Sequence, residues 1–460
     1  MKTNRPLPGT VSTGSQFLIY LILFHKFTHE VWQRVLERFG LNSGIFGSND
    51  WLGSHRTASD RLQEMWLADL FRLENEVVNR LTQNQSFGVF SAGISLDLEG
   101  SYQSQIGFGG WLTTIIPTLL GLSGESARFA IYLVPAAVSA GIVTVITKAL
   151  ELNFSIRRWM VFAFLLTQPW LIAFGTWPLV FGLRLLPILF LFRALARGQH
   201  DVWSICLAPA LLMIPGFASG YEFATVIVGM GLAAVAYFAV QRQWSFWTTL
   251  RMMIQTVVSF VLGLGLTLLL HLVQLRLRHG SFARGLEILE YQLSKRSGVG
   301  ENSVTDPLLL ESADAPLRLV MDWYLAVPVI LSPARVPILG ELTVGMLLVA
   351  CAMLTGLLIR RGLADTESRQ SAALGIATIV STLGPLSWIF LFRPWVYIHT
   401  HWAGVIWAFP TIPLATLFLV STFRYQPEHH VASRETASIT MVAVTFVGIA
   451  ASYFVALVMS

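Results

Sequence analysis

The sequence predicts an all-α protein that crosses a membrane many times, and three observations support this prediction. Of 460 residues, 54% are hydrophobic and only 12% are charged, whereas soluble domains carry about 25% charged residues. The mean hydropathy of +0.62 requires most of the chain to face lipid or other apolar helices. The apolar residues also form long unbroken runs without two-residue alternation, which predicts spanning helices and excludes a barrel.

About eleven apolar runs are predicted as membrane spans. They are 15–27, 128–150, 159–175, 177–196, 203–218, 221–240, 252–274, 337–360, 372–392, 403–423 and 438–459. Pro169, Pro178, Pro187 and Pro215 are expected to mark helix ends and kinks. Cys206 and Cys351 both lie inside apolar runs, so we expect them to serve as packing residues and to form no disulfide.

The arginines predict the orientation of these spans. Place Lys2 and Arg5 in the cytoplasm. The connectors that then lie on the cytoplasmic side, which alternate with the outer ones, carry arginines, and this is the positive-inside pattern. These arginines are Arg157, Arg158, Arg193, Arg197, Arg242, Arg251, Arg360, Arg361, Arg369, Arg424 and Arg434. The pattern holds only if the amphipathic stretch 108–122 rests on the outer surface, because a crossing there would invert every later span. The net charge of +5 is therefore a membrane signal, and no nucleic-acid partner is predicted.

Five segments follow from this topology. They are an uncleaved N-terminal anchor span (1–27), a large extracytoplasmic loop with amphipathic surface helices (28–127), a bundle (128–274), a second outer loop (275–336) and a C-terminal bundle (337–460). The first loop includes an acidic surface helix near 60–72, and the second includes a partly apolar helix near 317–331. A third outer loop is predicted at 393–402. The inner connectors are short and basic, so any chemistry is expected on the outer face.

The order of elements and one stretch of sequence resemble a known superfamily. Within 102–142, the chain has Gly110-Trp111-Leu-Thr-Thr-Ile-Ile-Pro, then Leu119-Leu-Gly121-Leu, then Ser126-Ala-Arg128-Phe-Ala. This order resembles the GT-C superfamily of integral-membrane glycosyltransferases, which includes protein mannosyltransferases and the aminoarabinose transferases of lipid A. In most members of that family an acidic pair follows the first span almost directly. Here Glu30 is the only acid so placed, and Asp97 and Glu99 come just before the surface stretch.

The resemblance implies a polyprenyl-phosphate sugar as donor, a lipid or glycan as acceptor, and no cofactor. A carboxylate must take the proton of the acceptor hydroxyl. Asp97 is the first choice for this base, followed by Asp50 and Glu99 and then by Glu30. The alternative is that Asp97 or Glu99 caps a helix or pairs with an arginine.

Cations must stabilise the departing phosphate, and arginine suits this role because its guanidinium binds phosphate with two hydrogen bonds. Arg276, Arg278 and His279 follow the outer end of the span 252–274, where they either bind phosphate or extend to the lipid headgroups. Arg184 lies inside a span, where an unpaired charge costs about 2.5 kcal/mol or more. It is a functional candidate or the partner of an acid such as Glu222.

Further substrate-binding candidates lie at other outer span ends. They are Tyr221 and Glu222 at the start of one span, and Arg393, Tyr397, His399 and His401 in the third outer loop. His399 and His401 could ligate a divalent metal on an extended backbone, but no third ligand is nearby, so no metal site is predicted. His271, near an outer span end, is expected to pack against a hydroxyl or a carbonyl.

The sequence therefore predicts a multi-pass protein of the bacterial inner membrane that transfers a sugar on the extracytoplasmic side. One rival is a glycan polymerase or O-antigen ligase, whose large loop usually comes late in the chain. The other is a transporter or flippase of lipid-linked glycans, which would show inverted repeats and broken helices near the membrane midplane. The sequence shows no matching halves, but Arg184 and the prolines within the spans keep that second rival open.

Overall fold

The computed structural model describes residues 13–25, 119–120, 122, 124–154, 158–166, 178–218, 220–221, 223–297, 317–326, 343–361, 366–398, 403–408 and 410–424. Within these ranges the chain is almost wholly helical and contains no β-strand, which confirms the all-α prediction. Its helices are α1 (Thr13–Phe24), α6 (Gly124–Phe154), α7 (Arg158–Leu166), α9 (Pro178–Ala196), the π-helix η2 (Trp203–Leu207), α10 (Ala208–Ala218), α11 (Ala224–Gln241), α12 (Phe246–His279), α13 (Phe282–Ser297), α15 (Leu317–Leu325), α16 (Val344–Arg361), α17 (Thr366–Ser381), α18 (Leu383–Leu391), α19 (Arg393–Ile398), α20 (Ala403–Ala408) and α21 (Thr411–Arg424).

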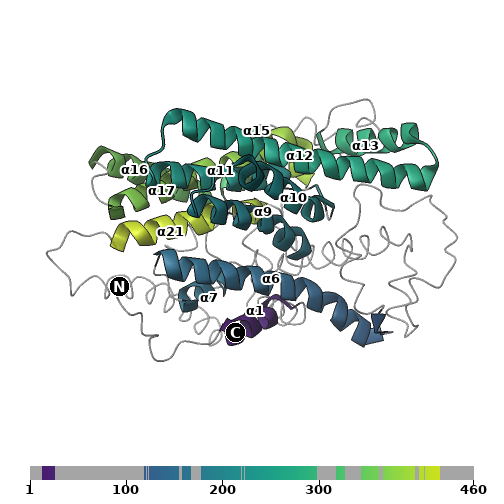
Figure 1. The fold of residues 1–460 in the computed structure, drawn as a ribbon, viewed down its shortest axis with the longest axis horizontal. Coiled ribbons are helices and arrows are strands. Elements are labelled where there is room, and N and C mark those ends of the chain that lie inside the picture. The colour runs from purple at the N-terminus through teal and green to yellow at the C-terminus, as the bar shows by residue number, and fades with distance from the viewer. Residues whose placement is uncertain are drawn as a thin grey trace.

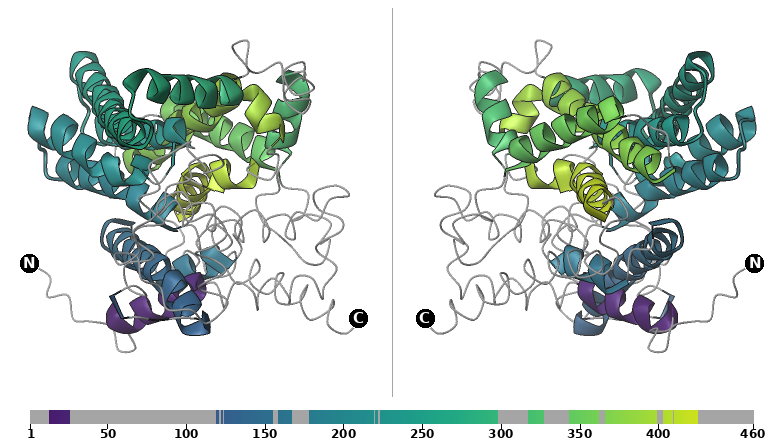
Figure 2. Two further views of the ribbon diagram at one scale, coloured as in Figure 1. Left: turned by 90° about the vertical axis from the view of Figure 1, so that its right-hand side faces the viewer. Right: turned by 90° about the vertical axis from the view of Figure 1, so that its left-hand side faces the viewer.

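The longer helices run side by side along the long axis of the molecule (Figure 1). The central helix is α11, whose residues are apolar all round and are buried almost throughout, as expected of a helix surrounded by others. It packs against α9, α12, α17 and α18. Helices α1, α6 and α7 form a separate layer below this bundle (Figure 2), and α6 joins the two layers by packing against α9.

Three helical stretches are long and apolar enough to cross a membrane: Ala224–Gln241, Phe246–Leu277 and Thr366–Leu391. Shorter apolar helices accompany them at Thr13–Phe24, Trp203–Ala218, Val344–Arg360 and Thr411–Thr422. These helices support a membrane protein, and each coincides with a predicted span. The total of about eleven spans stays a prediction, and the run 438–459 lies outside the described residues.

Two predicted loops contain helices that were not expected. The span 252–274 is longer than predicted, because α12 continues to His279 and ends at Gly280, whose φ is 74°. Helix α13 then packs back against α12, since its sequence is rich in the helix formers Leu, Glu and Arg. In the third outer loop, Arg393–Ile398 forms α19, whose first turn is closed by a 2.8 Å hydrogen bond from the Val396 amide to the Phe392 carbonyl.

Side-chain contacts show which helix ends lie together. Arg242, at the end of α11, donates a 2.5 Å hydrogen bond to the Ala196 carbonyl at the end of α9. The Phe154 ring, at the end of α6, lies 6.0 Å from that of Tyr237, which also bonds to Gln370 near the start of α17. We call this the Arg242 end of the bundle. Cationic residues predicted to be cytoplasmic gather here, including Arg193, Arg197, Arg251 and Arg369.

The opposite end, which we call the Tyr221 end, joins α11, α12 and α18. The Tyr221 hydroxyl, just before α11, is 3.0 Å from Nδ1 of His271 in α12. The Phe223 ring is 5.6 Å from the ring of Trp388 in α18, and the Trp388 ring in turn lies 4.4 Å from the ring of Phe392 at a tilt of 42°. Helices α9, α10, α11 and α12 therefore alternate in direction along the bundle.

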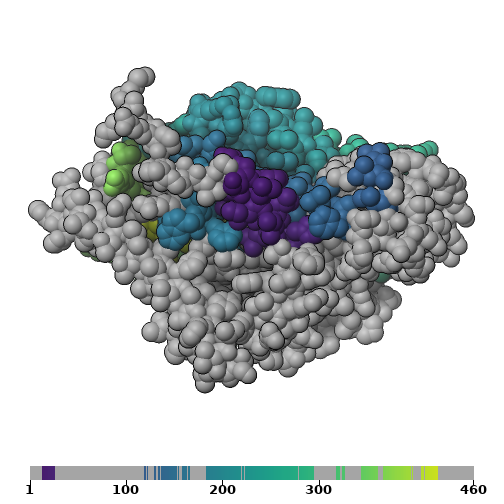
Figure 3. All heavy atoms as spheres, turned by 90° about the horizontal axis from the view of Figure 1, so that it is seen from below, coloured from purple at the N-terminus to yellow at the C-terminus, as the bar shows by residue number. Residues whose placement is uncertain are grey.

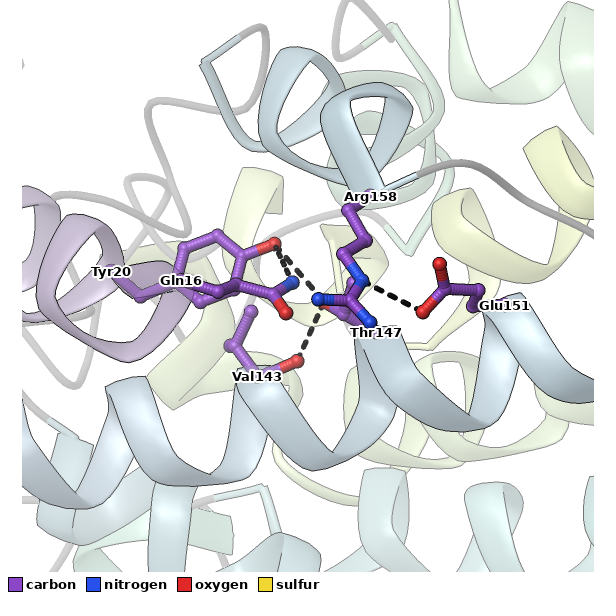
Figure 4. A network of polar contacts seen from close by, with 6 residues as sticks. All are labelled: Gln16, Tyr20, Val143, Thr147, Glu151 and Arg158. Carbon is purple, nitrogen blue, oxygen red and sulfur yellow. Dashed lines mark hydrogen bonds and ion pairs between the residues drawn. The ribbon is translucent and has the colours of Figure 1, made fainter. Parts of the chain in front are cut away.

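Helix α1 is fixed to α6 by a buried polar network (Figure 4). The Gln16 amide donates to the Tyr20 hydroxyl at 3.3 Å, and this hydroxyl lies 3.0 Å from Oγ1 of Thr147. Thr147 gives its own proton to the Val143 carbonyl at 2.7 Å, so Tyr20 must be the donor to Thr147. Buried polar groups need such partners, and the network therefore fixes how α1 lies along α6. Figure 3 shows α1 against α6 on the lower face.

The two helices run in opposite directions. The His25 ring, just after α1, lies 4.5 Å from that of Phe129 near the start of α6, while Gln16 and Tyr20 face the later part of α6. The chain therefore leaves α1 and enters α6 at the same end of the molecule. That end is opposite the Arg242 end, because α6 reaches the Arg242 end with Phe154. The outer position of the stretch 108–122 stays a prediction, because 26–118 lie outside the described residues.

Helices α9 and α11 end in the same way, and this similarity gives a first prediction. The Gln199 amide bonds to the Ala194 carbonyl at 3.0 Å, and the Trp244 amide bonds to the Ala239 carbonyl at 2.9 Å. Such an end needs a residue in the left-handed conformation, which is Gly198 (φ 75°) after α9 but Gln243 (φ 54°) after α11.

Gln243→Gly should raise the free energy of unfolding by about 1 kcal/mol, because glycine adopts the left-handed conformation without strain, and Gly198→Ala should lower it by a similar amount. Thermal unfolding in one detergent would measure both changes, and a fall with Gln243→Gly would contradict the explanation.

Candidate functional site

The described candidate residues lie at or near the Tyr221 end of the bundle. The structure describes the side chains of Arg184, Tyr221, Arg276, His279 and Arg393. For Arg278 and Tyr397 it describes only the helical backbone. The acids Glu30, Asp50, Asp97, Glu99 and Glu222 and the histidines His399 and His401 lie outside the described residues. The site built below is therefore the basic and aromatic part of the predicted one.

Arg184 is buried, with 3% of its surface exposed, and binds the end of the neighbouring helix. Its Nε donates to the Gly216 carbonyl at 3.4 Å, and one terminal nitrogen donates to the Gly220 carbonyl. Gly216 lies in the last turn of α10, where carbonyls lack helical partners and the helix dipole is negative. A Cβ on Gly216 would lie 2.8 Å from Cγ of Arg184. The guanidinium therefore holds the chain just before Tyr221.

Tyr221 and His271 form a hydrogen-bonded pair across two helices. Besides the 3.0 Å contact of the hydroxyl with Nδ1, their rings stack with centroids 5.8 Å apart. His271 is fully buried, and Tyr221 is partly exposed. This contact confirms the expectation that His271 packs against a hydroxyl. Because His271 fixes the position of the Tyr221 hydroxyl, it belongs to the candidate site although the sequence did not assign it there.

An apolar cluster lies beside this pair. Met213 and Phe217 of α10, Ile227 of α11 and Phe260 of α12 are all buried, and the Tyr221 ring packs against them. Hydrogen bonds and interactions between charges are stronger next to such a low-dielectric region than they are in water. The arrangement therefore places a partly exposed tyrosine at the border between an apolar interior and the end of the bundle.

Arg276 and His279 lie in the last turns of α12, beyond His271. Arg276 is exposed, and its guanidinium carbon lies 4.8 Å above the centre of the Phe282 ring of α13. Arg278 comes seven residues after His271, which places it on the same side of α12 by the helical repeat. Two arginine positions thus follow the Tyr221–His271 pair along one helix.

Helices α13, α15 and α19 form a layer, which we call the terminal layer, where α12 and α18 end. Helix α19 packs against α13, α15 and α18, and the Tyr324 hydroxyl of α15 donates to the Val396 carbonyl of α19 at 3.3 Å. Complete burial raises the pKa of Tyr324, so its hydroxyl stays a neutral donor. Arg393, half-buried at the start of α19, belongs to this layer. Basic residues from the second and third predicted outer loops are therefore brought to the same layer.

The described part of the chain offers phosphate-binding chemistry and a hydroxyl donor. Its residues form no group of three or more His, Cys, Asp or Glu side chains that could hold a metal ion. The sequence contains only a weak indication of the Tyr221–His271 pair, because a single histidine near the end of a span is common. The dependence of the Arg184 contact on Gly216 had no signal in the sequence.

The sequence matches no known family model, and no curated protein or solved structure matches it.

Proposed function

We propose that this protein is a glycosyltransferase that moves a sugar from a polyprenyl-phosphate donor to a lipid or glycan acceptor on the outer face of a bacterial cell membrane. The observation that carries the proposal is a convergence. Arg276 and His279 follow the Tyr221–His271 pair on α12, and α12 and Arg393 of α19 meet through α13. The helix ends that flank the acidic segment, marked by His25 and Phe129, lie away from the Arg242 end.

The proposed reaction needs both parts of the site. An ionised carboxylate takes the proton of the acceptor hydroxyl while its oxygen attacks the sugar carbon from the side opposite the phosphate. The bond between that carbon and the phosphate oxygen breaks, so the configuration inverts, and the lipid phosphate leaves with the electron pair. Asp97 is the proposed base, and Asp50 and Glu99 are the alternatives.

Cationic side chains would stabilise the phosphate as its charge increases. Arg276 and Arg393 suit this role, and the Tyr221 hydroxyl adds a neutral donor. Arg278, His279, Glu222, Tyr397, His399 and His401 are proposed to complete the donor and acceptor sites. Arg184 instead has backbone carbonyl partners, which gives the buried charge a structural role and weakens the support that it lent to a transporter.

The substitution Asp97→Asn should lower transfer by about 100-fold or more, because a general base contributes about 10²–10⁴-fold. The assay is transfer of a radiolabelled sugar from its polyprenyl phosphate to acceptor lipids in proteoliposomes. The matched control is Asp60→Asn, which changes an acid of the predicted surface helix on the same segment and should leave the rate within a factor of two or so.

Three other outcomes of this assay have distinct meanings. Unchanged transfer with Asp97→Asn would remove Asp97 from the role of base and lead to the same test of Asp50 and Glu99. Movement of the labelled lipid across the bilayer without cleavage would replace the enzyme by a carrier. Extension of an existing glycan by many units would favour a polymerase.

A further inference from the structure

Two connectors lie side by side at the Arg242 end of the bundle. One joins α9 to η2 (197–202), and the other joins α11 to α12 (242–245). Arg242 bonds to the Ala196 carbonyl, and a Cβ on Gly198 would lie 3.3 Å from a terminal nitrogen of Arg242. The His200 ring meets the Trp244 ring edge-on at 4.9 Å. Helix η2 also packs against α12. Residues 193–204 and 242–251 therefore form one continuous surface, which we call the connector patch.

The connector patch is strongly cationic. Its arginines, Arg193, Arg197, Arg242 and Arg251, are all exposed. Asp201 is the one acid within 193–204 and 242–251, and it is already engaged, because its carboxylate accepts a 2.9 Å hydrogen bond from the Ser204 amide. That bond and one from the Ser204 hydroxyl lower the pKa of Asp201. The patch therefore attracts anions despite this single acid.

Large aromatic side chains surround the arginines. Trp203, Phe246 and Trp247 are 58%, 70% and 74% exposed, and the rings of Phe246 and Trp247 meet edge-on at 5.2 Å. Exposed tryptophans of this kind favour the boundary between lipid headgroups and acyl chains. Beyond the patch, α10 and α12 continue with exposed apolar residues, including Leu211 and Val261. One surface thus offers cations, then aromatic rings, then aliphatic side chains. This is the order of the phosphate, the glycerol and the acyl chains in a phospholipid.

Arg242 is held in a defined orientation. Its guanidinium carbon lies 5.2 Å from the centre of the Phe238 ring, in addition to the bond to Ala196. A cation fixed in this way loses less conformational entropy on binding than a free surface arginine. This distinguishes the connector patch from the exposed arginine Arg360, which lies on α16 outside the patch.

We propose that the connector patch is a binding site for an anionic phospholipid, in which the arginines hold the headgroup phosphate and the aromatic rings flank the glycerol. The proposal depends on the membrane location of the chain and not on the proposed glycosyltransferase activity. Recognition is by charge and by the acyl chains together, so a free phosphate ion should bind far more weakly than the lipid.

The test measures binding of fluorescent phosphatidylglycerol and phosphatidylcholine to the full-length protein purified in a neutral detergent. We expect a preference for phosphatidylglycerol that falls about fivefold for each arginine removed, since a juxtamembrane cation contributes a factor of about this size. Arg197→Gln with Arg251→Gln should therefore weaken phosphatidylglycerol binding about 25-fold and leave phosphatidylcholine binding unchanged. Trp247→Ala should weaken the binding of both lipids.

The matched control is Arg360→Gln, which removes an exposed arginine from the same end of the bundle. It should leave phosphatidylglycerol binding unchanged, and melting temperatures in detergent would show that all variants are folded. Equal binding of the two lipids, an undiminished affinity in the double variant, or an equal loss with Arg360→Gln would overturn the proposal. Displacement of the lipid by millimolar inorganic phosphate would show a simple anion site instead.

Discussion

Gly384→Ala should prevent folding or lower the free energy of unfolding by about 3 kcal/mol. A Cβ at Gly384 would lie 2.7 Å from Cα of Val226 and 2.9 Å from the Thr225 carbonyl oxygen. Both are backbone atoms of α11, so no side-chain rotation can relieve the overlap, and the two helices must separate. Separation would also break the 3.1 Å hydrogen bond from the Thr225 hydroxyl to the Gly384 carbonyl. Yield and thermal unfolding in detergent would measure the effect.

The chain provides both a partner substitution and a control for this test. Gly229→Ala should be as damaging, because its Cβ would lie 2.8 Å from the amide nitrogen of Gly384. Gly356→Ala should be harmless or slightly stabilising, because no atom lies within 4 Å of its added Cβ and alanine favours the helix. If Gly384→Ala and Gly356→Ala melt at the same temperature, α11 and α18 do not cross at this pair of glycines.

Arg184→Ala should lower the free energy of unfolding by about 3 kcal/mol, since hydrogen bonds to charged groups are worth about 1.5–3 kcal/mol each. The substitution removes the guanidinium that donates hydrogen bonds to the Gly216 and Gly220 carbonyls at the buried end of α10. It also opens a cavity between α9 and α10. Thermal unfolding in detergent would give the size of the loss, and Arg184→Lys should recover little of it, because an ammonium lacks the planar fork.

Arg158→Ala is the control for Arg184. Arg158 also makes a hydrogen-bonded contact, 2.7 Å from Nε to Glu151, but about a quarter of its side chain is exposed. Exposed ion pairs contribute about 0–1 kcal/mol, so this variant should be nearly as stable as the parent. Equal losses for the two variants would mean that burial does not set the cost, and the structural role given to Arg184 would be wrong.

The close contact of Gly229 with Gly384 and the hydrogen bonds of Arg184 together explain how this bundle can hold a polar site. Close contact at Gly229 and Gly384 brings α18 against the start of α11, and the Phe223–Trp388–Phe392 rings then connect the start of α11 to Arg393. Arg184 fixes the chain on the other side of Tyr221. The position of the Tyr221 hydroxyl therefore depends both on the packing of α11 against α18 and on the contact of Arg184 with the end of α10. Gly384→Ala should disturb this position even if the protein still folds.

The sequence alone determined that the protein is all-helical and rich in apolar helices, and it predicts the direction in which those helices cross a membrane. Long apolar runs without alternation have one solution in lipid, which is the helix, and the described residues are helical at each predicted span that they cover. The arginines at span ends gave a pattern that needs no tertiary information, because each reports only on which side of a membrane it is placed. His271 was likewise expected beside a hydroxyl or carbonyl, since a buried imidazole needs a partner.

Only the tertiary structure decided which residues meet. Gly229 and Gly384 look like ordinary small residues in apolar runs, and nothing in the sequence indicated that Arg184 binds the carbonyls of Gly216 and Gly220. Helices α13 and α19 were expected to be loops. Hydrophobic periodicity and charge report how one segment divides between lipid, water and the protein interior. Contacts between helices depend instead on how closely two backbones approach and on the angle at which they cross, and these are set by shape across segments far apart in the chain.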